Sequence, residues 1–480
     1  MSGKLALLTD LYELTMMQGY HKYNLNPEVV FDMFFRRQPF RGGFSVFAGL
    51  EDAVRGITEL KFYKDDIEYL AGLKLFKDDF LHYLEDFKFN GDVYAMNEGS
   101  IVFPNEPLLR IHSSLIEAQL IESFVLNTIN FQTLIATKAA RVYLASREGV
   151  VLEFGLRRAH GINGALAASR AAFIGGATAT SNTLAGKIYG IPVKGTMAHS
   201  WVMAFCNEYE AFKKYADTYP DSTVLLIDTY DSLGSGIDNA VKVGKRLKEK
   251  GEKLGVRLDS GDLEYISKQV RKKLDNAGLK DAKITVSNEL DEMIINQLVN
   301  RGAPIDYWGV GTKLVTAGGD SSLTGVYKLV AKKTDRHFEP VIKLSDNPQK
   351  ITNPAVKQVY RFYNGNNMFL ADLLALEGER IKEGRRYKFY HPMYEYKYLT
   401  IKDYSSIEPL LSIKIKKGKI AYELPKLASI QENTKKNLKM LDDTYKRLIN
   451  PHVYKVSLSE KLKQVKFNLI KKHLKEQPGK

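Results

Sequence analysis

The sequence has one cysteine, Cys206, among 480 residues, and only two tryptophans. A single thiol cannot form an internal disulfide or a cysteine-ligated metal cluster, and an unpaired thiol is typical of the cytoplasm, where we expect the protein. Runs of 18 or more apolar residues are also missing, so we expect no membrane span. Near the start, the apolar stretch 5–8 is too short for a secretory signal.

Several motifs of well-known enzyme classes are missing too. The sequence contains no Gly-x-x-x-x-Gly-Lys-Ser/Thr loop, no Gly-x-Gly-x-x-Gly after a strand, no His-Glu-x-x-His and no Gly-x-Ser-x-Gly. Use of ATP would therefore need a route without a Walker loop. A nucleophilic histidine is one such route.

The net charge of +14 comes mainly from the end of the chain, because residues 411–480 hold 18 Lys and Arg against 6 Asp and Glu. Apolar residues at Leu438, Leu441, Leu458 and Leu462 have helical spacing there. Two interpretations compete, a nucleic-acid patch and a solvated lysine face on packed helices. Aromatic residues are sparse in this tail and no nucleic-acid-binding motif is present, so we expect the solvated face and no nucleic-acid partner.

A chain of this length predicts two domains, or one barrel with a flanking domain. Both ends show mixed α and β patterns, which predicts a flanking α+β domain formed by residues 1–115 together with 341–480, whose last part is the basic helical tail. Residues 116–340 are the expected α/β barrel. A long helix over 116–147 is expected to open it.

Six short apolar runs follow, and each ends in polar residues or glycine before a helical stretch such as 238–249 or 263–276. Apolar parallel strands that alternate with helices favour a sheet covered on both faces or a barrel. Because every run has its polar residues directly after it, a barrel with one common mouth is favoured over an open sheet. The runs are 150–154, 191–193, 224–227, 255–258, 284–286 and 307–310.

The expected mouth of the barrel combines cations, carboxylates and glycine-exposed amides. Arginines bind carboxylates or phosphates with two hydrogen bonds, exposed amides can cradle phosphate, and Asp228 and Asp259 would suit Mg²⁺. The pattern predicts a small anionic phosphate ester with a magnesium ion. The residues at this mouth are Arg157, Arg158, Thr196, His199, Asp228, Asp231, Arg257, Asp259, Ser287, Asn288, Gly309, Gly311, Thr312 and Lys313.

Each of these signals also has a structural interpretation. The segment 228–231 could be a helix cap, the glycines at 309–311 could serve close packing, and a lone His199 could be a hydrogen-bonded structural residue. Arg257 is harder to explain in that way, since it lies inside a predicted strand where a buried charge needs a partner. Asp259 is two residues further on and so shares its strand face.

Several segments, in this order, resemble the bacterial nicotinate phosphoribosyltransferase family. The likeness covers nearly the whole chain, and its specificity comes from the number of segments rather than from any one. They are Thr9–Tyr12, Glu153–Ala159, Gly195–Ser200, Arg257–Asp262, Gly309–Thr312 and Asn450–Val456.

The resemblance implies an irregular (β/α) barrel of the type II phosphoribosyltransferase kind. It implies transfer of the phosphoribosyl group from phosphoribosyl pyrophosphate (PRPP) to nicotinate, giving nicotinate mononucleotide in NAD salvage. ATP hydrolysis is coupled to this transfer, which places the family among the ligases. His199 matches the histidine that ATP phosphorylates, and Asp259 matches a second catalytic position.

The resemblance also implies a homodimer with its active site at the subunit interface, because Tyr12 matches a tyrosine that stacks on nicotinate from the partner subunit. Asp228 and Asp259 would lie toward the ribose and Mg²⁺. The other expected nicotinate contacts are Phe154, Arg157, Thr196 and Arg257. The expected PRPP and phosphate contacts are Ser287, Asn288, Gly309, Gly311 and Thr312.

The nearest alternative is nicotinamide phosphoribosyltransferase. Amide-specific relatives place an aspartate where Ser181 and Asn182 lie here, and an aspartate would repel a carboxylate substrate. The uncharged pair and Arg257 therefore favour nicotinate. A basic nucleic-acid-binding protein is a remote alternative that rests on the tail alone. A type I phosphoribosyltransferase is disfavoured because Ile227-Asp228 lacks the Gly-Gly-Thr turn that should follow.

Overall fold

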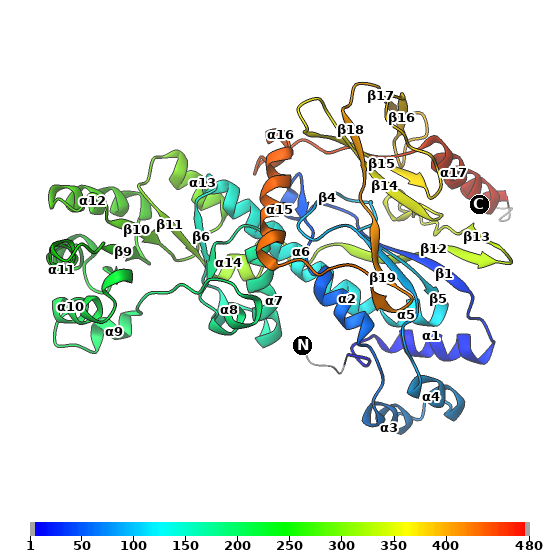
Figure 1. Ribbon diagram of the computed structural model, residues 1–480, viewed down its shortest axis with the longest axis horizontal. Coiled ribbons are helices and arrows are strands. Elements are labelled where there is room, and N and C mark those ends of the chain that lie inside the picture. The colour runs from blue at the N-terminus through cyan, green and yellow to red at the C-terminus, as the bar shows by residue number, and fades with distance from the viewer. Residues whose placement is uncertain (1–4, 476–480) are drawn as a thin grey trace. The chain divides into compact units, whose positions relative to one another are not determined.

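The structure is a computed structural model that describes residues 5–475 and forms two compact units (Figure 1). One unit combines the two chain ends, Met1–Leu134 and Ser322–Lys480, and the other is the continuous segment Ile135–Ser321. The unit boundaries differ by about twenty residues from the limits 116 and 340 read from the sequence. Within the described residues, no helix is long and apolar enough to cross a bilayer.

The continuous unit contains a six-stranded, wholly parallel sheet in the order β7-β6-β11-β10-β9-β8. Its strands are short and their inner residues are buried, which matches the apolar runs in the sequence. An isolated parallel bridge between Thr180 and Val193 adds one more segment beside β7. The strands are β6 Val150–Glu153, β7 Ala179–Thr180, β8 Val224–Leu226, β9 Gly255–Leu258, β10 Lys283–Val286 and β11 Tyr307–Val310.

Helices follow the strands of this unit, and Figure 1 shows α10, α11 and α12 in a row beside β9 and β10. The buried face of α11 is built from Ile237, Ala240, Val243 and Leu247 at helical spacing. These helices are α7 Gly161–Ile174, α8 Thr183–Tyr189, α9 His199–Met203, α10 Glu208–Thr218, α11 Ile237–Glu249, α12 Leu263–Asn276, α13 Glu292–Asn300 and α14 Thr312–Val315.

Two expectations about local structure are wrong. The single helix over 116–147 is instead α5 (Leu115–Leu120) followed by α6 (Glu122–Ala145). Ile121 between them keeps right-handed φ and ψ of −83° and −6°, so the interruption is local. The run 191–193 is not a regular strand, since only Val193 pairs, through the single bridge to Thr180.

The unit built from both chain ends is organised around β1, which pairs antiparallel with β5 on one side and with β12 on the other. Phe31 of β1 faces Ile111 and Leu329, and these side chains are buried or half-buried. The sheet order is β13-β12-β1-β5-β3-β19-β20. Its strands are β1 Glu28–Phe35, β3 Asp92–Ala95, β5 Leu109–Ser114, β12 Gly325–Thr334, β13 His337–Pro340, β19 Ser412–Lys416 and β20 Lys419–Ile420.

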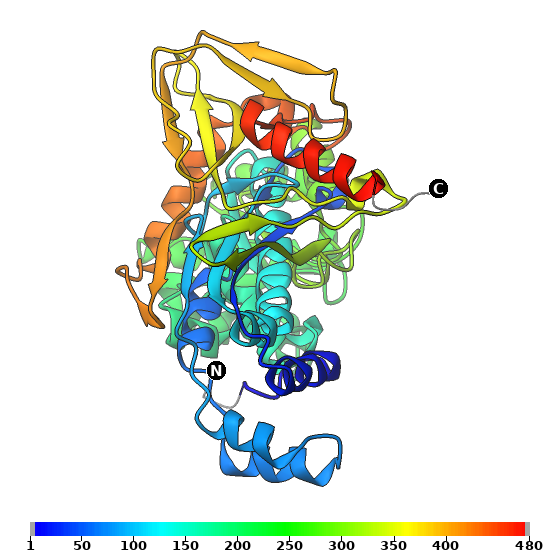
Figure 2. The same cartoon turned by 90° about the vertical axis from the view of Figure 1, so that its right-hand side faces the viewer.

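A second, six-stranded sheet in this unit has the order β17-β16-β21-β15-β14-β18. Helix α17 lies beside this sheet (Figure 2). Its Leu462 packs in one buried cluster with Leu374 and Tyr390. The strands are β14 Lys357–Tyr363, β15 Phe369–Leu376, β16 Tyr387–Tyr390, β17 Tyr398–Ile401, β18 Ser406–Pro409 and β21 Val456–Leu458, with a separate pair β2 Ser45–Val46 and β4 Ile101–Val102.

The basic tail is helical only in part, because strands β19, β20 and β21 lie in it as well as α15, α16 and α17. Most lysines of α17 are exposed or half-buried. Lys466 is an exception, because it is buried and its ammonium group donates to Asn353 Oδ1 and the Pro392 carbonyl. The remaining helices of this unit are α1 Leu11–Lys22, α2 Leu50–Thr58, α3 Lys64–Gly72, α4 Asp78–Glu85, α15 Leu427–Met440, α16 Asp443–Lys446 and α17 Glu460–Lys475.

Candidate active site

The register of the parallel sheet brings the predicted site residues together. Arg257 of β9 lies between Leu226 of β8 and Thr285 of β10. Thr285 in turn pairs with Tyr307 of β11. Two residues further along each strand, the chain places four site residues next to one another at the carboxyl edge of the sheet. They are Asp228, Asp259, Ser287 and Gly309.

Arg257 is the half-buried centre of this group. Its Nη1 donates to Thr196 Oγ1 at 2.7 Å, its Nε to Ser287 Oγ at 2.9 Å and its Nη2 to Asp259 Oδ1 at 3.2 Å. The charged Arg257 side chain therefore has the hydrogen-bond partners that its position inside a strand predicts. Ser287 also donates to Asp259 Oδ1, so the three side chains form a closed hydrogen-bonded ring.

Asp228 is not the helix cap that the sequence left open as an alternative. Its Oδ2 accepts from the Asp259 amide at 2.8 Å and from Ser260 Oγ at 2.7 Å. Its Oδ1 is buried and has no hydrogen-bond partner within residues 5–475. Asp231 is the capping residue instead, since it accepts from the amides of Leu233 and Gly234. Asp228 therefore keeps one carboxylate oxygen for another ligand.

His199 begins helix α9, and its side chain is 42% exposed. Its Nδ1 is 3.1 Å from Thr229 Oγ1, and its Nε2 is 4.0 Å from Asp259 Oδ2. The first contact orients the ring, while the second places an imidazole nitrogen near a carboxylate. An exposed, oriented imidazole of this kind is accessible to an incoming phosphoryl group.

The ring of Phe154 closes one side of the group, with the Arg257 guanidinium 5.8 Å from its centroid. Gly309 packs against this ring, because a Cβ there would lie 2.7 Å from Phe154 Cδ2. The glycine therefore serves close packing, as the structural interpretation proposed. Gly311 and the half-buried Thr312 follow at the start of α14.

The buried carboxylate of Glu153, the residue before Phe154, fixes the backbone and side chains around this ring. It accepts from the Gly155 amide, from Ser169 Oγ at 2.8 Å and from the Thr180 hydroxyl. Asn182 joins the same network, since its Nδ2 donates to Ser169 Oγ and its Oδ1 caps α8 at the Ala185 amide. Asn182 is 2% exposed, so its side chain does not line a pocket as expected; only Ser181 of that pair is half-buried.

The remaining predicted residues lie outside this hydrogen-bonded group. Arg157 and Asn288 are exposed, and Asn288 has a left-handed φ of 83°. Tyr12 lies in the unit built from the chain ends, on α1, where it is 48% exposed. Their roles stay predictions.

Sequence reasoning missed Thr229, Ser260 and Glu153 as parts of the site. Thr229 and Ser260 each directly follow a predicted aspartate, so adjacency was the available signal. Glu153 opens the segment Glu153–Ala159, but its position there does not indicate a supporting role. Its role depends on Ser169 and Thr180, which lie on α7 and β7 and have no recognisable spacing to it.

The sequence matches three profiles. Residues 7–130 match the nicotinate phosphoribosyltransferase (NAPRTase) N-terminal domain, residues 150–367 match the NAPRTase family, and residues 356–466 match the NAPRTase C-terminal domain. The chain is 44% identical over 460 residues to nicotinate phosphoribosyltransferase of Bacillus subtilis (strain 168), covering 95% of this chain and 93% of that protein.

The chain belongs to the nicotinate phosphoribosyltransferase family. The Caenorhabditis elegans nicotinate phosphoribosyltransferase is 38% identical over 523 residues, with 95% of this chain and 92% of that protein covered. The profiles and both relatives extend through the two units, so membership rests on the whole chain rather than on the barrel alone.

Solved structures agree with this family. The crystal structure of human nicotinic acid phosphoribosyltransferase superposes with a TM-score of 0.86 at 32% identity and covers 96% of this chain and 100% of that chain. A nicotinate-nucleotide pyrophosphorylase from Pyrococcus furiosus has a TM-score of 0.69 at 24% identity and supports the fold alone. The predicted fold, an irregular α/β barrel of the type II phosphoribosyltransferase kind with a flanking α+β domain, is confirmed.

Proposed function

We propose that this chain transfers the 5-phosphoribosyl group from PRPP to the ring nitrogen of nicotinate, releasing pyrophosphate. The observation that carries the proposal is the fixed position of the Arg257 guanidinium. It donates hydrogen bonds to Thr196, Ser287 and Asp259 and lies beside the Phe154 ring. An aromatic wall next to a fixed guanidinium suits a flat ring with a carboxylate. The nicotinamide alternative is disfavoured, since its amide carries no charge for Arg257 to bind.

The transfer requires groups that bind the nicotinate carboxylate and groups that bind the phosphates of PRPP. The nicotinate nitrogen attacks ribose C1′ while the bond from C1′ to the pyrophosphate oxygen breaks, and positive charge develops on the sugar. Arg257 holds the nicotinate carboxylate, so that the ring nitrogen is aimed at C1′. The amides and hydroxyls at Ser287, Asn288, Gly309, Gly311 and Thr312 are proposed to hold PRPP.

We infer that His199 accepts a phosphoryl group from ATP. The ring is exposed and oriented by Thr229, which supports in-line access of an imidazole nitrogen to the γ-phosphorus. The nitrogen–phosphorus bond forms as the bond to ADP breaks. A phosphorylated His199 adds charge at the mouth and orders nearby loops before transfer.

Magnesium fits this site as an ion that arrives with the substrate. Asp228 has a buried Oδ1 without a partner in the described chain, and Asp259 Oδ2 is the oxygen left outside the ring with Arg257. Within residues 5–475 no cluster of three or more His, Cys, Asp or Glu side chains could hold a metal alone. Mg²⁺ commonly takes one or two carboxylates and completes its shell with phosphate oxygens and water. The charge of the ion would neutralise the leaving pyrophosphate.

We further propose a homodimer in which Tyr12 reaches the partner's nicotinate site. Tyr12 is exposed on α1, as are Leu11 and Met16 of the same helix, which are 52% and 37% exposed; Leu8, which precedes the helix, is 50% exposed. Exposed apolar side chains in one short segment support contact with another chain. We place the protein in the cytoplasm, supported by its exposed free thiol at Cys206.

Nucleotide formation from PRPP tests the activity, with nicotinate or nicotinamide, each with and without ATP. We expect ATP-stimulated turnover of nicotinate only. Turnover of nicotinamide at a comparable kcat/KM would contradict the proposed role of Arg257. Turnover that is unaffected by ATP would leave the transfer reaction standing and remove the phosphohistidine.

Mixing two inactive variants tests the shared site. Tyr12→Ala and Arg257→Met each lose activity alone. If Tyr12 acts on the partner's site, a mixed dimer holds one intact site, so random exchange restores about a quarter of wild-type activity. If Tyr12 acts within its own chain, mixing restores nothing.

A further inference from the structure

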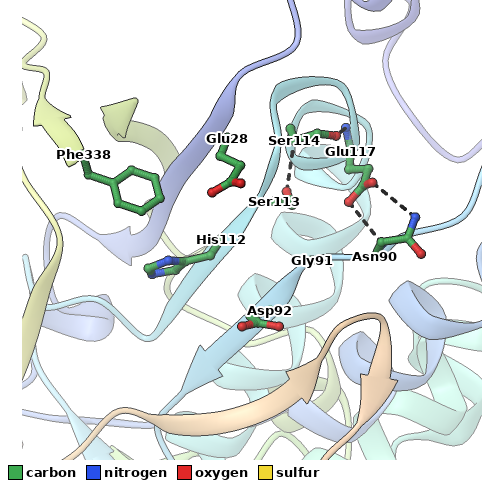
Figure 3. A pocket seen from close by; sticks show the side chains of 9 residues that line it. All are labelled: Glu28, Asn90, Gly91, Asp92, His112, Ser113, Ser114, Glu117 and Phe338. Carbon is green, nitrogen blue, oxygen red and sulfur yellow. Dashed lines mark hydrogen bonds between the residues drawn. The ribbon is translucent and has the colours of Figure 1, made fainter. Parts of the chain in front are cut away.

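Two hollows in the described part of the unit built from both chain ends differ in the charge of the residues that line them. The first, of about 330 Å³, is lined by three carboxylates, from Glu28, Asp92 and Glu117, together with His112 (Figure 3). Burial lowers the pKa of His112 to about 3, so the imidazole stays neutral. The carboxylates already accept from Lys333, the Lys417 amide and Asn90. This hollow is unsuited to an anion.

The second hollow, which we call the Arg41 pocket, encloses about 700 Å³. It lies between two segments far apart in sequence, 38–43 and 448–454, and none of its lining residues is acidic. Its volume is in the range that small-molecule sites occupy. Its lining includes Gln38, Phe40, Arg41, Ile449, Asn450, His452 and Val453.

Both segments hold strained backbone at the edge of the pocket. Phe40, Arg41 and Asn450 have φ of 57°, 49° and 48°, although none is glycine. Such a conformation is unfavourable for residues other than glycine and persists only where the surroundings fix it. Gly43 is fixed against the Tyr445 carbonyl and Pro451, where a Cβ would not fit. The geometry of the edge is therefore fixed rather than adaptable.

The wall behind the pocket is rigid as well. Tyr454 stacks on Phe103 with ring centroids 3.7 Å apart, and its hydroxyl donates to Asp372 Oδ1 at 3.0 Å. Arg361 donates to both oxygens of the same carboxylate, at 3.0 and 2.6 Å. All four side chains are buried. A pocket with a fixed aromatic wall loses little conformational entropy when a flat ring binds.

We propose that the Arg41 pocket is a second ligand site, distinct from the one proposed for catalysis, and that it takes a nucleoside phosphate. The base lies against the apolar surface of Phe40, Ile449 and Val453. The phosphate meets the guanidinium of Arg41 and a ring N–H of His452. The side-chain amides of Gln38 and Asn450 supply hydrogen bonds to the sugar.

Equilibrium dialysis with radiolabelled AMP tests the site in the full-length protein. Nicotinate mononucleotide is kept in excess to fill the catalytic site. We expect one AMP per chain, at least tenfold weaker binding in Arg41→Met, and unchanged turnover of nicotinate in that variant. Arg37→Met is the matched control, since Arg37 is an exposed arginine of the same loop that does not line the pocket.

A second variant separates lost binding from lost folding. Val453 is 78% exposed, so Val453→Glu should fold normally while adding a carboxylate that repels the phosphate. AMP binding at wild-type strength in Val453→Glu and Arg41→Met would overturn the proposal. So would equal losses in Arg37→Met and Arg41→Met, or no saturable binding to the wild-type chain. These outcomes are binding measurements and do not depend on turnover, so they test the Arg41 pocket even if the transferase assay fails.

Discussion

The guanidinium of Arg257 in β9 and the carboxylate of Asp259, the first residue after β9, have Nη2 and Oδ1 3.2 Å apart, and both contact the Ser287 hydroxyl. The other Asp259 oxygen is 4.0 Å from His199 Nε2. One carboxylate thus stands between the proposed nicotinate-binding arginine and the proposed phosphate-accepting histidine. A change at either of these residues is expected to affect the other.

Arg257→Lys tests the need for a planar fork. Lysine keeps the charge but cannot donate to Thr196, Ser287 and Asp259 and still bind a carboxylate with two hydrogen bonds. We expect kcat/KM for nicotinate to fall about a hundredfold, equivalent to roughly 2.7 kcal/mol. Steady-state kinetics measures this. Arg246→Lys, at an exposed ion pair with Asp217, should leave the kinetics unchanged.

Asp228→Asn tests the metal proposal. An asparagine oxygen can still accept from the Asp259 amide and Ser260, so the loop should keep its structure. The atom that replaces the unpartnered Oδ1 becomes an amide nitrogen, which does not bind Mg²⁺. We expect the Mg²⁺ concentration for half-maximal turnover to rise at least tenfold. Asp231→Asn keeps its cap and serves as control; an equal rise in both variants would remove Asp228 as a ligand.

His199→Asn removes the proposed phosphate acceptor. We expect no acid-labile label from [γ-³²P]ATP and no stimulation by ATP, while slow ATP-independent transfer persists because Arg257 and its partners remain. Thr229→Val should reduce labelling severalfold, since it removes only the contact at Nδ1. Full labelling of His199→Asn would place the phosphoryl group elsewhere.

Glu13 predicts a pH-dependent stability. It lies on the buried side of α1, where burial raises its carboxyl pKa to about 7, and Glu122 and Asp10 raise the pKa further through their charge. Because the folded pKa exceeds the ordinary value of 4.5, the stabilising protonated form is complete below pH 4.5 and is lost as the pH rises through 7. The difference corresponds to on the order of 3 kcal/mol.

Glu13→Gln should therefore melt at a higher temperature than the wild type at pH 8.5. The gap should close by pH 4, since glutamine does not titrate and can still accept from Gln119. Melting curves across this pH range measure it. Glu85→Gln, at an exposed position on α4, should show no such trend. A gap that stays constant with pH would rule out Glu13 as the titrating group.

Most of the mouth could be predicted because parallel strands align their carboxyl ends. Asp259 is two residues after Arg257 and directly follows the end of β9, so the alternation of strand side chains predicts that both point to the same side. Neighbouring strands then fix Asp228 and Ser287 beside them through register.

What escaped prediction depends on contacts without local spacing. The sequence predicts Asn182 as a pocket residue, but its side-chain amide donates to Ser169 Oγ on α7 and accepts from the Ala185 amide at the start of α8. Strand β7 has two residues, too few to give a period. Strand β12 was missed because its partner β1 lies about 300 residues earlier in the chain, and its lysines interrupt the apolar pattern.

The placement of β1 has a consequence for synthesis. One side of β1 can pair with β5 early, but the other side waits for β12 at residues 325–334, after the whole continuous unit has left the ribosome. The continuous unit can fold in the meantime, since its sheet draws only on residues 150–310. Until then the nascent chain carries an open, apolar sheet edge along Val29–Phe35, which is the kind of surface that chaperones cover.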